Sequence, residues 1–351
     1  MRTSFGVMRD RPALFVRVED SDGAEGWGEV WCNFPDCGAE HRARLLHGVF
    51  APLAIGSEPS RVAGELASRT AVLAIQSGEP GPVHQCIAGI DIALADLAAR
   101  RANAPLWRYL GGSSPRIRAY ASGISPEGPG DIAAACRAQG HRAFKLKVGF
   151  GASRDLANLR DMRATLGDDA IVMADANQAW DLREATSMAE RMRAFGLAWL
   201  EEPLRADRPW DEWRALASST QVPLAGGENI AGLEAFDEAL AARSLRVIQP
   251  DVAKWGGISG CLEVAGRALR AGLRYCPHYL GGGIGLLASA HLLAAAGGDG
   301  MLEIDSNPNE LRTLTCGPVR DIREGWVRLG EAPGLGEAPD LAALERFRAA
   351  P

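Results

Sequence analysis

The sequence contains no apolar run long enough to cross a membrane. Its longest apolar stretch, residues 284–296, is interrupted by His291 and falls short of the ~20 residues that a membrane-spanning helix needs. We therefore expect a buried helix here and no contact with a membrane. The first twelve residues carry charged side chains but no apolar segment, which predicts that there is no secretory signal and that the protein is cytoplasmic.

An excess of positive charge and paired cysteines are also lacking. The 38 Lys and Arg residues are outnumbered by 44 Asp and Glu residues, so the formal net charge is -6 at pH 7. We expect no basic face for a phosphate backbone, and therefore no nucleic-acid partner. The seven cysteines form no CxxC pair and show no zinc-ligand spacing, which is typical of reduced thiols without a catalytic role.

The composition is that of a globular protein with about two domains, or with one barrel and an appendage: 351 residues, 47% hydrophobic and 23% charged. In residues 1–115, extended segments at 13–19 and 27–31 flank a turn, and helical patterns follow. We expect a long helix over residues 82–109 that ends at the glycines 111–112. Residues 1–115 are interpreted as a separate α+β domain.

Strand-like and helix-like segments alternate in the rest of the chain. Eight short apolar runs are separated by helical patterns, at residues 118–123, 143–149, 171–177, 198–203, 223–229, 247–254, 275–280 and 301–305. Eight strand–helix units in about 200 residues predict a closed parallel (β/α)-barrel. An open doubly wound sheet is the rival, but no glycine-rich phosphate loop follows the first strand. We place the barrel domain at residues 116–320 and expect residues 321–351 to pack back on the first domain.

Two lysines lie on the second of these strands. Lys145 and Lys147 are two residues apart, so both side chains project from the same face of the strand. Repulsion between the ammonium groups and a nearby metal ion lower a lysine pKa, which makes one lysine usable as a base near pH 7. Taken alone, the pattern is weak, because a solvated strand end gives it too.

The next three strands end in the carboxylates Asp175, Glu201 and Glu228. Acids at the same ends of adjacent parallel strands converge, and their mutual repulsion calls for a hard divalent cation; all-oxygen ligands favour Mg²⁺. Glu202 competes with Glu201, because neighbours on a strand face opposite ways. We favour Glu201 as the ligand.

The sixth and seventh strands end in Asp251 and His278. An aspartate beside a histidine fixes the tautomer of the ring and raises its basicity, which is typical of a general acid/base. Glu303, on the eighth strand, is expected either to hydrogen-bond the substrate in a protonated form or to make a salt bridge. His291 lies in the middle of an apolar segment and is interpreted as structural.

In this order the motifs resemble the enolase superfamily, and within it the mandelate racemase subgroup. The resemblance covers nearly the whole chain. Its motifs are the helix of residues 88–97, the two lysines, Asp175-Ala176-Asn177-Gln178-Ala179-Trp180, Glu201-Glu202-Pro203, Gly227-Glu228-Asn229, Asp251 with Lys254-Trp255-Gly256-Gly257, and Pro277-His278. The related muconate-lactonizing subgroup would carry a lysine in place of Asp251 and no histidine dyad.

The resemblance implies an enolase-like fold, which is a modified TIM barrel with an N-terminal capping domain, and a shared partial reaction. A small carboxylate substrate would bind Mg²⁺, and a base would remove its α-proton. Lys147 would be the base on one face, Lys145 would hold the carboxylate, and Asp251 with His278 would serve the opposite face. The metal ligands would be Asp175, Glu201 and Glu228.

Two bases on opposite faces permit either dehydration or racemisation. We favour dehydration of an acid sugar, an aldonate or aldarate, to a 2-keto-3-deoxy acid, because most relatives with this dyad resemble such dehydratases. The alternatives are a racemase or epimerase of a 2-hydroxy acid or amino acid derivative, and a catalytically inactive structural or binding homologue. By analogy with relatives we expect a homo-oligomer, either a dimer or an octamer.

Two loops are expected to shape the substrate site. In the first domain, Asn33 and Phe34 belong to a segment that resembles loops closing over the substrate, and Asn177 is a third expected contact. The glycine-rich loop of residues 281–285 follows His278 and is longer than usual in the subgroup. Its glycines either let the backbone approach a ligand closely or make a flexible turn.

Overall fold

The N-terminal part of the protein is built around a β-hairpin of β3 (Leu14–Glu19) and β4 (Glu25–Val30). The turn between them is closed by Asp20, whose carboxylate accepts the backbone N–H groups of Asp22 and Ala24. The structure, a computed structural model, describes residues 2–4, 6–8 and 10–349. The two strands predicted in this region are confirmed within two residues. A smaller hairpin precedes them, β1 (Arg2–Thr3) with β2 (Gly6–Val7).

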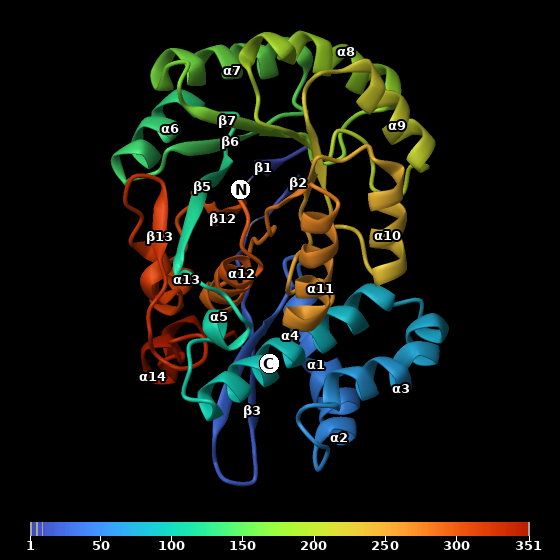
Figure 1. Ribbon diagram of the computed structural model, residues 1–351, viewed down its shortest axis with the longest axis vertical. Coiled ribbons are helices and arrows are strands. Elements are labelled where there is room, and N and C mark those ends of the chain that lie inside the picture. Colours follow the sequence, from blue (N-terminus) through green and yellow to red (C-terminus); the bar gives the residue numbers. More distant parts are fainter. Residues whose placement is uncertain (1, 5, 9, 350–351) are drawn as a thin grey trace.

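Helices complete this capping domain, which is blue in Figure 1. They are α1 (Gly38–Leu45), η1 (Leu46–Phe50), α2 (Ala51–Ala54), α3 (Val62–Ser77) and α4 (Pro80–Arg101). The helix α4 lies directly on β4, because glycines face each other where they meet. A Cβ atom on Gly28 would lie 2.0 Å from the carbonyl oxygen of Gly89.

The helix predicted over residues 82–109 is wrong at its C-terminal end. α4 ends at Arg101, and a separate short helix, α5 (Leu106–Tyr109), follows it. Asn103 has a φ of 47° and Pro105 has an extended backbone, so the chain leaves the helical conformation between them. Proline disfavours helical geometry in the residue before it, which explains the break.

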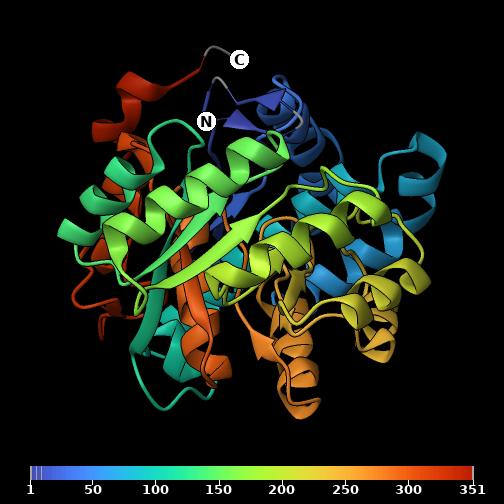
Figure 2. The ribbon, with the colours of Figure 1, turned by 90° about the horizontal axis from the view of Figure 1, so that it is seen from above.

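Eight parallel strands form the barrel in the order expected from the sequence. They are β5 (Arg116–Ile124), β6 (Ala143–Lys147), β7 (Ile171–Asp175), β8 (Leu200–Glu201), β9 (Leu224–Gly226), β10 (Val247–Ile248), β11 (Arg274–Tyr275) and β12 (Met301–Asp305). β12 pairs with β5, so the sheet curls round on itself (Figure 2). Closure is incomplete: in the described part of the chain no strand ladder joins β11 to β12, and the Met301 N–H donates to Cys276 Sγ at 3.4 Å instead.

Helices surround the strands, and side chains fill the barrel below its rim. The helices are α6 (Pro129–Ala138), α7 (Ala152–Leu166), α8 (Leu182–Met192), α9 (Trp210–Ser219), α10 (Leu233–Ala242), α11 (Gly257–Arg270), α12 (Gly283–Ala296) and α13 (Glu310–Thr315). Tyr120, Met173 and Trp199 belong to a buried apolar cluster of residues in or next to the strands. This packed interior leaves the carboxyl ends of the strands as the place for polar side chains.

The chain after the barrel returns to both domains. β13 (Trp326–Arg328) pairs antiparallel with β5, and α14 (Leu341–Leu344) lies near the end of the chain. Asp96 of α4 accepts the N–H groups of Trp27 and Leu335, so it ties the cap hairpin to this C-terminal segment. The domain boundaries at residues 115 and 320 stay predictions.

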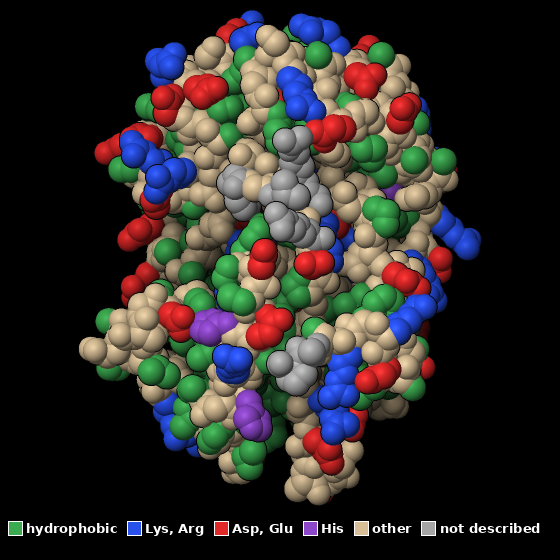
Figure 3. Space-filling model, turned by 180° about the vertical axis from the view of Figure 1, so that it is seen from behind, with side chains coloured by type: hydrophobic (Ala, Val, Ile, Leu, Met, Phe, Trp, Pro, Cys, Tyr) green, Lys and Arg blue, Asp and Glu red, His purple; other side chains and the backbone are tan. Residues whose placement is uncertain are grey.

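The buried helix predicted at residues 284–296 is present as α12. All residues of this helix except the last two are buried. Across residues 2–4, 6–8 and 10–349, none of the helices has the length and apolar character that spanning a membrane requires. Acidic and basic side chains are interspersed on the face seen in Figure 3, and no field of one sign covers it.

Candidate active site

The predicted lysines and the first predicted acid meet at the end of neighbouring strands. β6 and β7 pair in a register that sets Lys147 opposite Asp175, and the Lys147 Nζ lies 2.5 Å from Asp175 Oδ2. Asp175 also accepts the backbone N–H and the side-chain amide of Asn177, at 2.8 and 3.2 Å. Alternation along β6 points Lys145 into the barrel below Lys147, as the sequence predicted.

Lys145 is held between two buried carboxylates. Its Nζ lies 2.7 Å from Glu201 Oε2 and 2.7 Å from Glu303 Oε1, and its side chain is fully buried. Glu201 also accepts the side-chain amide of Gln249 at 2.7 Å. The Lys145 side chain therefore links β6 to β8 and β12 across the interior of the barrel.

The expected contact between Asp251 and His278 is present. His278 Nδ1 lies 2.7 Å from Asp251 Oδ2, and its Nε2 lies 2.8 Å from Glu228 Oε2 and 3.9 Å from Glu303 Oε2. Burial disfavours the imidazolium, but the carboxylates of Glu228, Glu303 and Asp251 outweigh burial and raise the pKa of His278 well above its usual value. A basic histidine oriented by an aspartate is the arrangement that the sequence predicted.

The pKa expected for the lysines is wrong in direction. Burial opposes the charge of Lys147, but attraction by Asp175 outweighs burial and the repulsion from Lys145, and raises the pKa of this amine. In the same way, attraction by Glu201 and Glu303 overcomes burial and raises the pKa of Lys145 well above its usual value. The sequence reveals the repulsion between the two amines but not the closer carboxylates that exceed it.

Of the two roles expected for Glu303, the structure shows the salt bridge, which this carboxylate makes with Lys145. Burial would raise the pKa of this carboxyl, but the charges of Lys145 and His278 prevail and lower it to about 2. Ser122 at the end of β5 also donates its hydroxyl to Glu303. An ionised Glu303 cannot donate a hydrogen bond to a substrate.

The acids at the ends of β7, β8 and β9 do not form a ready-made ligand shell. In the described residues, no three His, Cys, Asp or Glu groups are spaced to hold a metal ion. Each predicted ligand instead faces a cation: Asp175 faces Lys147, Glu201 faces Lys145, and Glu228 faces His278.

Glu202, the rival of Glu201, is also buried. The Asn229 amide donates to Glu202 Oε1 at 2.8 Å and to Glu228 Oε1 at 3.3 Å, so it bridges the two acids. Burial, followed by repulsion from Glu228, raises the pKa of Glu202 well above its usual value. The sequence placed Glu202 on the opposite side of the strand, but its φ of 39° turns the chain after β8 back towards the rim.

The charges at this rim nevertheless suit a divalent cation. Six carboxyl groups (Asp175, Glu201, Glu202, Glu228, Asp251 and Glu303) lie here with four basic side chains (Lys145, Lys147, Lys254 and His278), so the acidic groups outnumber the basic groups by two. Burial and the nearby acids raise the pKa of Glu201 to about 7 even beside Lys145. Asn177 Oδ1 is buried with no hydrogen-bond partner among the described residues. Oxygen donors that outnumber the basic side chains around them fit Mg²⁺.

Comparison with known proteins fits this geometry. The sequence matches the family described as mandelate racemase / muconate lactonizing enzyme, N-terminal domain, over residues 1–111, and the enolase C-terminal domain-like family over residues 131–343. The chain belongs to the enolase superfamily, in the mandelate racemase/muconate lactonizing enzyme family. The enolase-like fold predicted from the motifs is therefore confirmed.

Members of this family with similar sequences include enzymes of sugar acids and their lactones. D-galactarolactone cycloisomerase of Agrobacterium fabrum is 30% identical, with 96% of this chain and 92% of the relative covered. A crystal structure of a mandelate racemase/muconate lactonizing enzyme from Bordetella bronchiseptica RB50 is 62% identical, with a TM-score of 0.94 and coverage of 96% and 94%. The L-talarate dehydratase of Polaromonas sp. JS666, in complex with Mg and L-glucarate, is 29% identical, with a TM-score of 0.81 and coverage of 95% and 91%.

The enolase-superfamily rim also contains residues that the sequence analysis did not assign. Gln249 and Ser122 contact the buried carboxylates, and Lys254 Nζ lies 2.7 Å from Asn229 Oδ1 and 3.5 Å from Glu228 Oε2. Their positions carried a usable signal, because Ser122 lies near the end of the first predicted strand and Gln249 is a polar residue of the sixth. Lys254 stands in one of the motifs that resemble the family.

The cap segment of this family member lies over the rim near β10. The Trp31 N–H donates to the carbonyl of Ala253, and the ring of Trp31 lies 4.9 Å from Lys254 Nζ and 6.1 Å from the Phe34 ring. The Asn33 amide donates to the carbonyl of Leu280, on the segment that follows His278. Substrate contacts by Asn33, Phe34 and Asn177 stay predictions.

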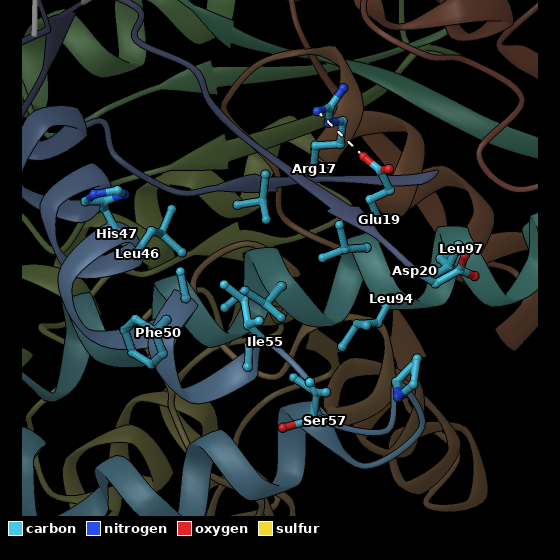
Figure 4. Close-up of a pocket in the computed structure, with 18 of the residues that line it drawn as sticks. Arg17, Glu19, Asp20, Leu46, His47, Phe50, Ile55, Ser57, Leu94 and Leu97 are labelled. Carbon is cyan, nitrogen blue, oxygen red and sulfur yellow. Dashed lines mark ion pairs between the residues drawn. The ribbon is translucent and has the colours of Figure 1, made fainter. Parts of the chain in front are cut away.

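A separate cavity of about 950 Å³ lies within the capping domain (Figure 4). Its walls are mainly apolar and include Leu46, Phe50, Ile55 and Leu94. None of the residues that line it is a predicted site residue, so the chemistry of the enolase-superfamily rim lies elsewhere.

Proposed function

We propose that this protein is a Mg²⁺-dependent enzyme that removes the α-proton of an acid sugar and eliminates the β-hydroxyl as water. The observation that carries the proposal is that Lys147 on β6 and the Asp251–His278 pair after β10 and β11 border one buried acidic cluster. The strand order separates β6 from β10 by four positions in a ring of eight, so the two groups stand across the mouth of the barrel. A substrate between them would meet a proton acceptor on one side and a proton donor on the other.

Asp175, Glu201 and Glu228 would hold the cation, with Glu201 rather than Glu202 because β7 and β8 pair in a register that aligns Asp175 with Glu201. When bound, Mg²⁺ supplies stabilisation of the negative charge that develops on the substrate carboxylate. The proposal is supported by the excess of carboxyl groups over basic side chains at the rim and by a Mg-bound dehydratase among the relatives. Lys145 would bind a substrate carboxylate oxygen.

The side chains would then move protons. Lys147, freed from Asp175 as that carboxylate turns to the cation, would accept the α-proton at Nζ. His278, whose protonated form is favoured by the carboxylates of Glu228, Glu303 and Asp251, would donate from Nε2 to the departing β-hydroxyl, which leaves as water. The resulting enol becomes a 2-keto-3-deoxy acid. General acid and base steps each contribute typically 10²–10⁴-fold, so both groups are needed for a useful rate.

Cycloisomerisation of a sugar lactone is the second candidate, favoured by the 30% identity to a D-galactarolactone cycloisomerase. It would begin with the same α-proton removal, but the leaving group would be the ring ester oxygen instead of hydroxide. A racemase would use the same two groups to return the proton to the opposite face. Assembly into a homo-oligomer stays a prediction from the resemblance.

The deciding experiment is a ¹H NMR screen of aldonates, aldarates and their lactones with the purified protein and MgCl₂ in ²H₂O. A 2-keto-3-deoxy acid formed from an open-chain acid supports dehydration, and Lys147→Met should abolish it. A 2-keto or ring-opened acid formed only from lactones would replace dehydration by cycloisomerisation. Exchange of the α-hydrogen with inversion and without loss of water would identify a racemase, and no change in any acid would contradict the whole proposal.

A further inference from the structure

The glycine-rich segment after His278 is closely packed. A Cβ atom on Gly282 would lie 2.6 Å from Glu29 Oε1, and one on Gly285 would lie 2.2 Å from the hydroxyl oxygen of Tyr279. Both distances are shorter than real Cβ contacts. The glycines are therefore present to let the backbone approach these two side chains, and the flexible-turn interpretation does not apply.

Glu29, from the capping-domain strand β4, holds this segment. Its side chain is buried, with Oε1 accepting the Gly282 N–H at 2.5 Å and Oε2 accepting the Gly285 N–H at 2.9 Å. The Tyr279 hydroxyl also bonds to this carboxylate. The two glycine N–H groups lie at the start of α12, where a negative charge is favoured by the helix dipole.

The held segment is joined directly to His278. The N–H of Tyr279, the next residue, donates to Glu303 Oε2 at 3.2 Å, and the carbonyl of Leu280 accepts the Asn33 amide. From Tyr279 to the first turn of α12 the backbone is thus fixed at four residues by side chains of β4, the cap loop and β12. A shift of Glu29 would pass to the imidazole through only a few peptide bonds.

We propose that Glu29 is a positioning residue for His278: its carboxylate fixes the segment of residues 279–285 and so sets the place of the imidazole at the rim. This role rests on the proposed function for its catalytic consequence. With this role, the capping domain not only covers the substrate but also positions a group that transfers a proton. A displacement of about 1 Å in a reacting group costs on the order of 10²-fold in rate.

Glu29→Gln tests the role because it keeps the shape of the side chain. The amide can accept only one of the two glycine N–H groups, and its own NH₂ would face the other. We expect kcat for loss of water to fall about 10- to 100-fold with KM changed less than about threefold. Exchange of the substrate α-hydrogen, which depends on Lys147, should persist, so the ratio of exchange to water loss should rise at least about tenfold.

Asp96→Asn is the matched control. Asp96 is likewise a buried acid of the capping domain that accepts two backbone N–H groups, but those belong to Trp27 and Leu335, and neither precedes or follows a rim residue. Because Asp96 also forms an ion pair with Arg100 at 2.8 Å, Asp96→Asn should lower stability at least as much as Glu29→Gln does, with the exchange-to-elimination ratio unchanged. Equal ratios in the two variants would overturn the proposal.

A second readout does not depend on turnover. The ¹H–¹⁵N signals of the His278 ring should shift in Glu29→Gln and stay in place in Asp96→Asn, and the amides of residues 279–285 should exchange faster only in the former. If Glu29→Gln fails to fold, Tyr279→Phe removes a single hydrogen bond to the same carboxylate and should shift the ring signals in the same direction. Unshifted ring signals refute the positioning role, whereas a wild type inactive on every acid refutes the proposed function alone.

Discussion

At the scale of single residues, the barrel interior depends on charges that balance in pairs. Replacing Lys145 by Met leaves Glu201 and Glu303 buried without their shared cation. Breaking a buried ion pair in this way should lower the free energy of unfolding by about 3–5 kcal/mol. Urea denaturation with EDTA present measures the loss, and Arg214→Met, which removes an exposed ion pair with Asp211, should cost less than about 1 kcal/mol. Similar losses in the two variants would contradict this interpretation of the core.

A second residue, His291, predicts a pH dependence of stability. Its ring accepts the Trp107 N–H at 3.0 Å, and burial lowers its pKa to about 4. Because the unfolded chain binds a proton near pH 6.5 and the folded protein does not, this contribution is complete above pH 6.5 and is lost as pH falls towards 4. Between pH 7 and 4.5 the stability advantage of the wild type over His291→Gln should shrink by about 2–3 kcal/mol. Denaturant melts of the two proteins at both pH values check this, and an advantage that stays constant between pH 7 and 4.5 would contradict it.

At the scale of elements, the contact of α4 with β4 requires glycine. The Cβ atom of Gly28→Ala would lie 2.0 Å from the backbone oxygen of Gly89, so the strand and the helix must separate. We expect a loss of about 1–3 kcal/mol, as in other overpacked cores. Gly64→Ala is the matched control: Gly64 lies exposed within α3 with nothing within 4 Å of the added atom, and alanine there should stabilise by up to ~1 kcal/mol. Melting temperatures that change in the same direction in both variants would contradict this packing.

The elements also show what the sequence could and could not predict. Apolar runs located all eight barrel strands, and the polar residues that ended them included the rim groups, because strand ends in a parallel barrel share one side. Proline disfavours helical geometry in the residue before it, so Pro105 indicates that the helix predicted over residues 82–109 ends before this position. Two contacts join segments that are remote in the sequence: the ion pair of Lys147 with Asp175 and the hydrogen bond from the Gly282 N–H to Glu29. No local pattern contains them, and the pKa directions follow from such contacts.

At the scale of the whole molecule, the two domains meet where the chemistry is proposed. Asp91 of α4 accepts the N–H and the hydroxyl of Ser259 at the start of α11, at 3.0 and 2.7 Å. Glu29 of β4 accepts the N–H groups of Gly282 and Gly285 at the start of α12. These two helices follow the strands that carry Asp251 and His278. The cap therefore contacts the barrel on the side of the dyad, whereas the lysines are held by carboxylates of the barrel itself.

Metal binding tests the whole arrangement, because a ligand that binds only the folded protein stabilises it. At a Mg²⁺ concentration 100 times the Kd the gain is about 2.7 kcal/mol, so the melting temperature should rise in MgCl₂ relative to NaCl of equal ionic strength. Asp175→Asn and Glu201→Gln should abolish the rise, and Glu202→Gln should retain it, although Glu201 and Glu202 are adjacent and both buried. If Glu202→Gln alone removed the effect, the chain after β8 would supply the ligand through its turned residue. If no variant changed the melting response and the wild type gave none, the proposed Mg²⁺ site would be wrong.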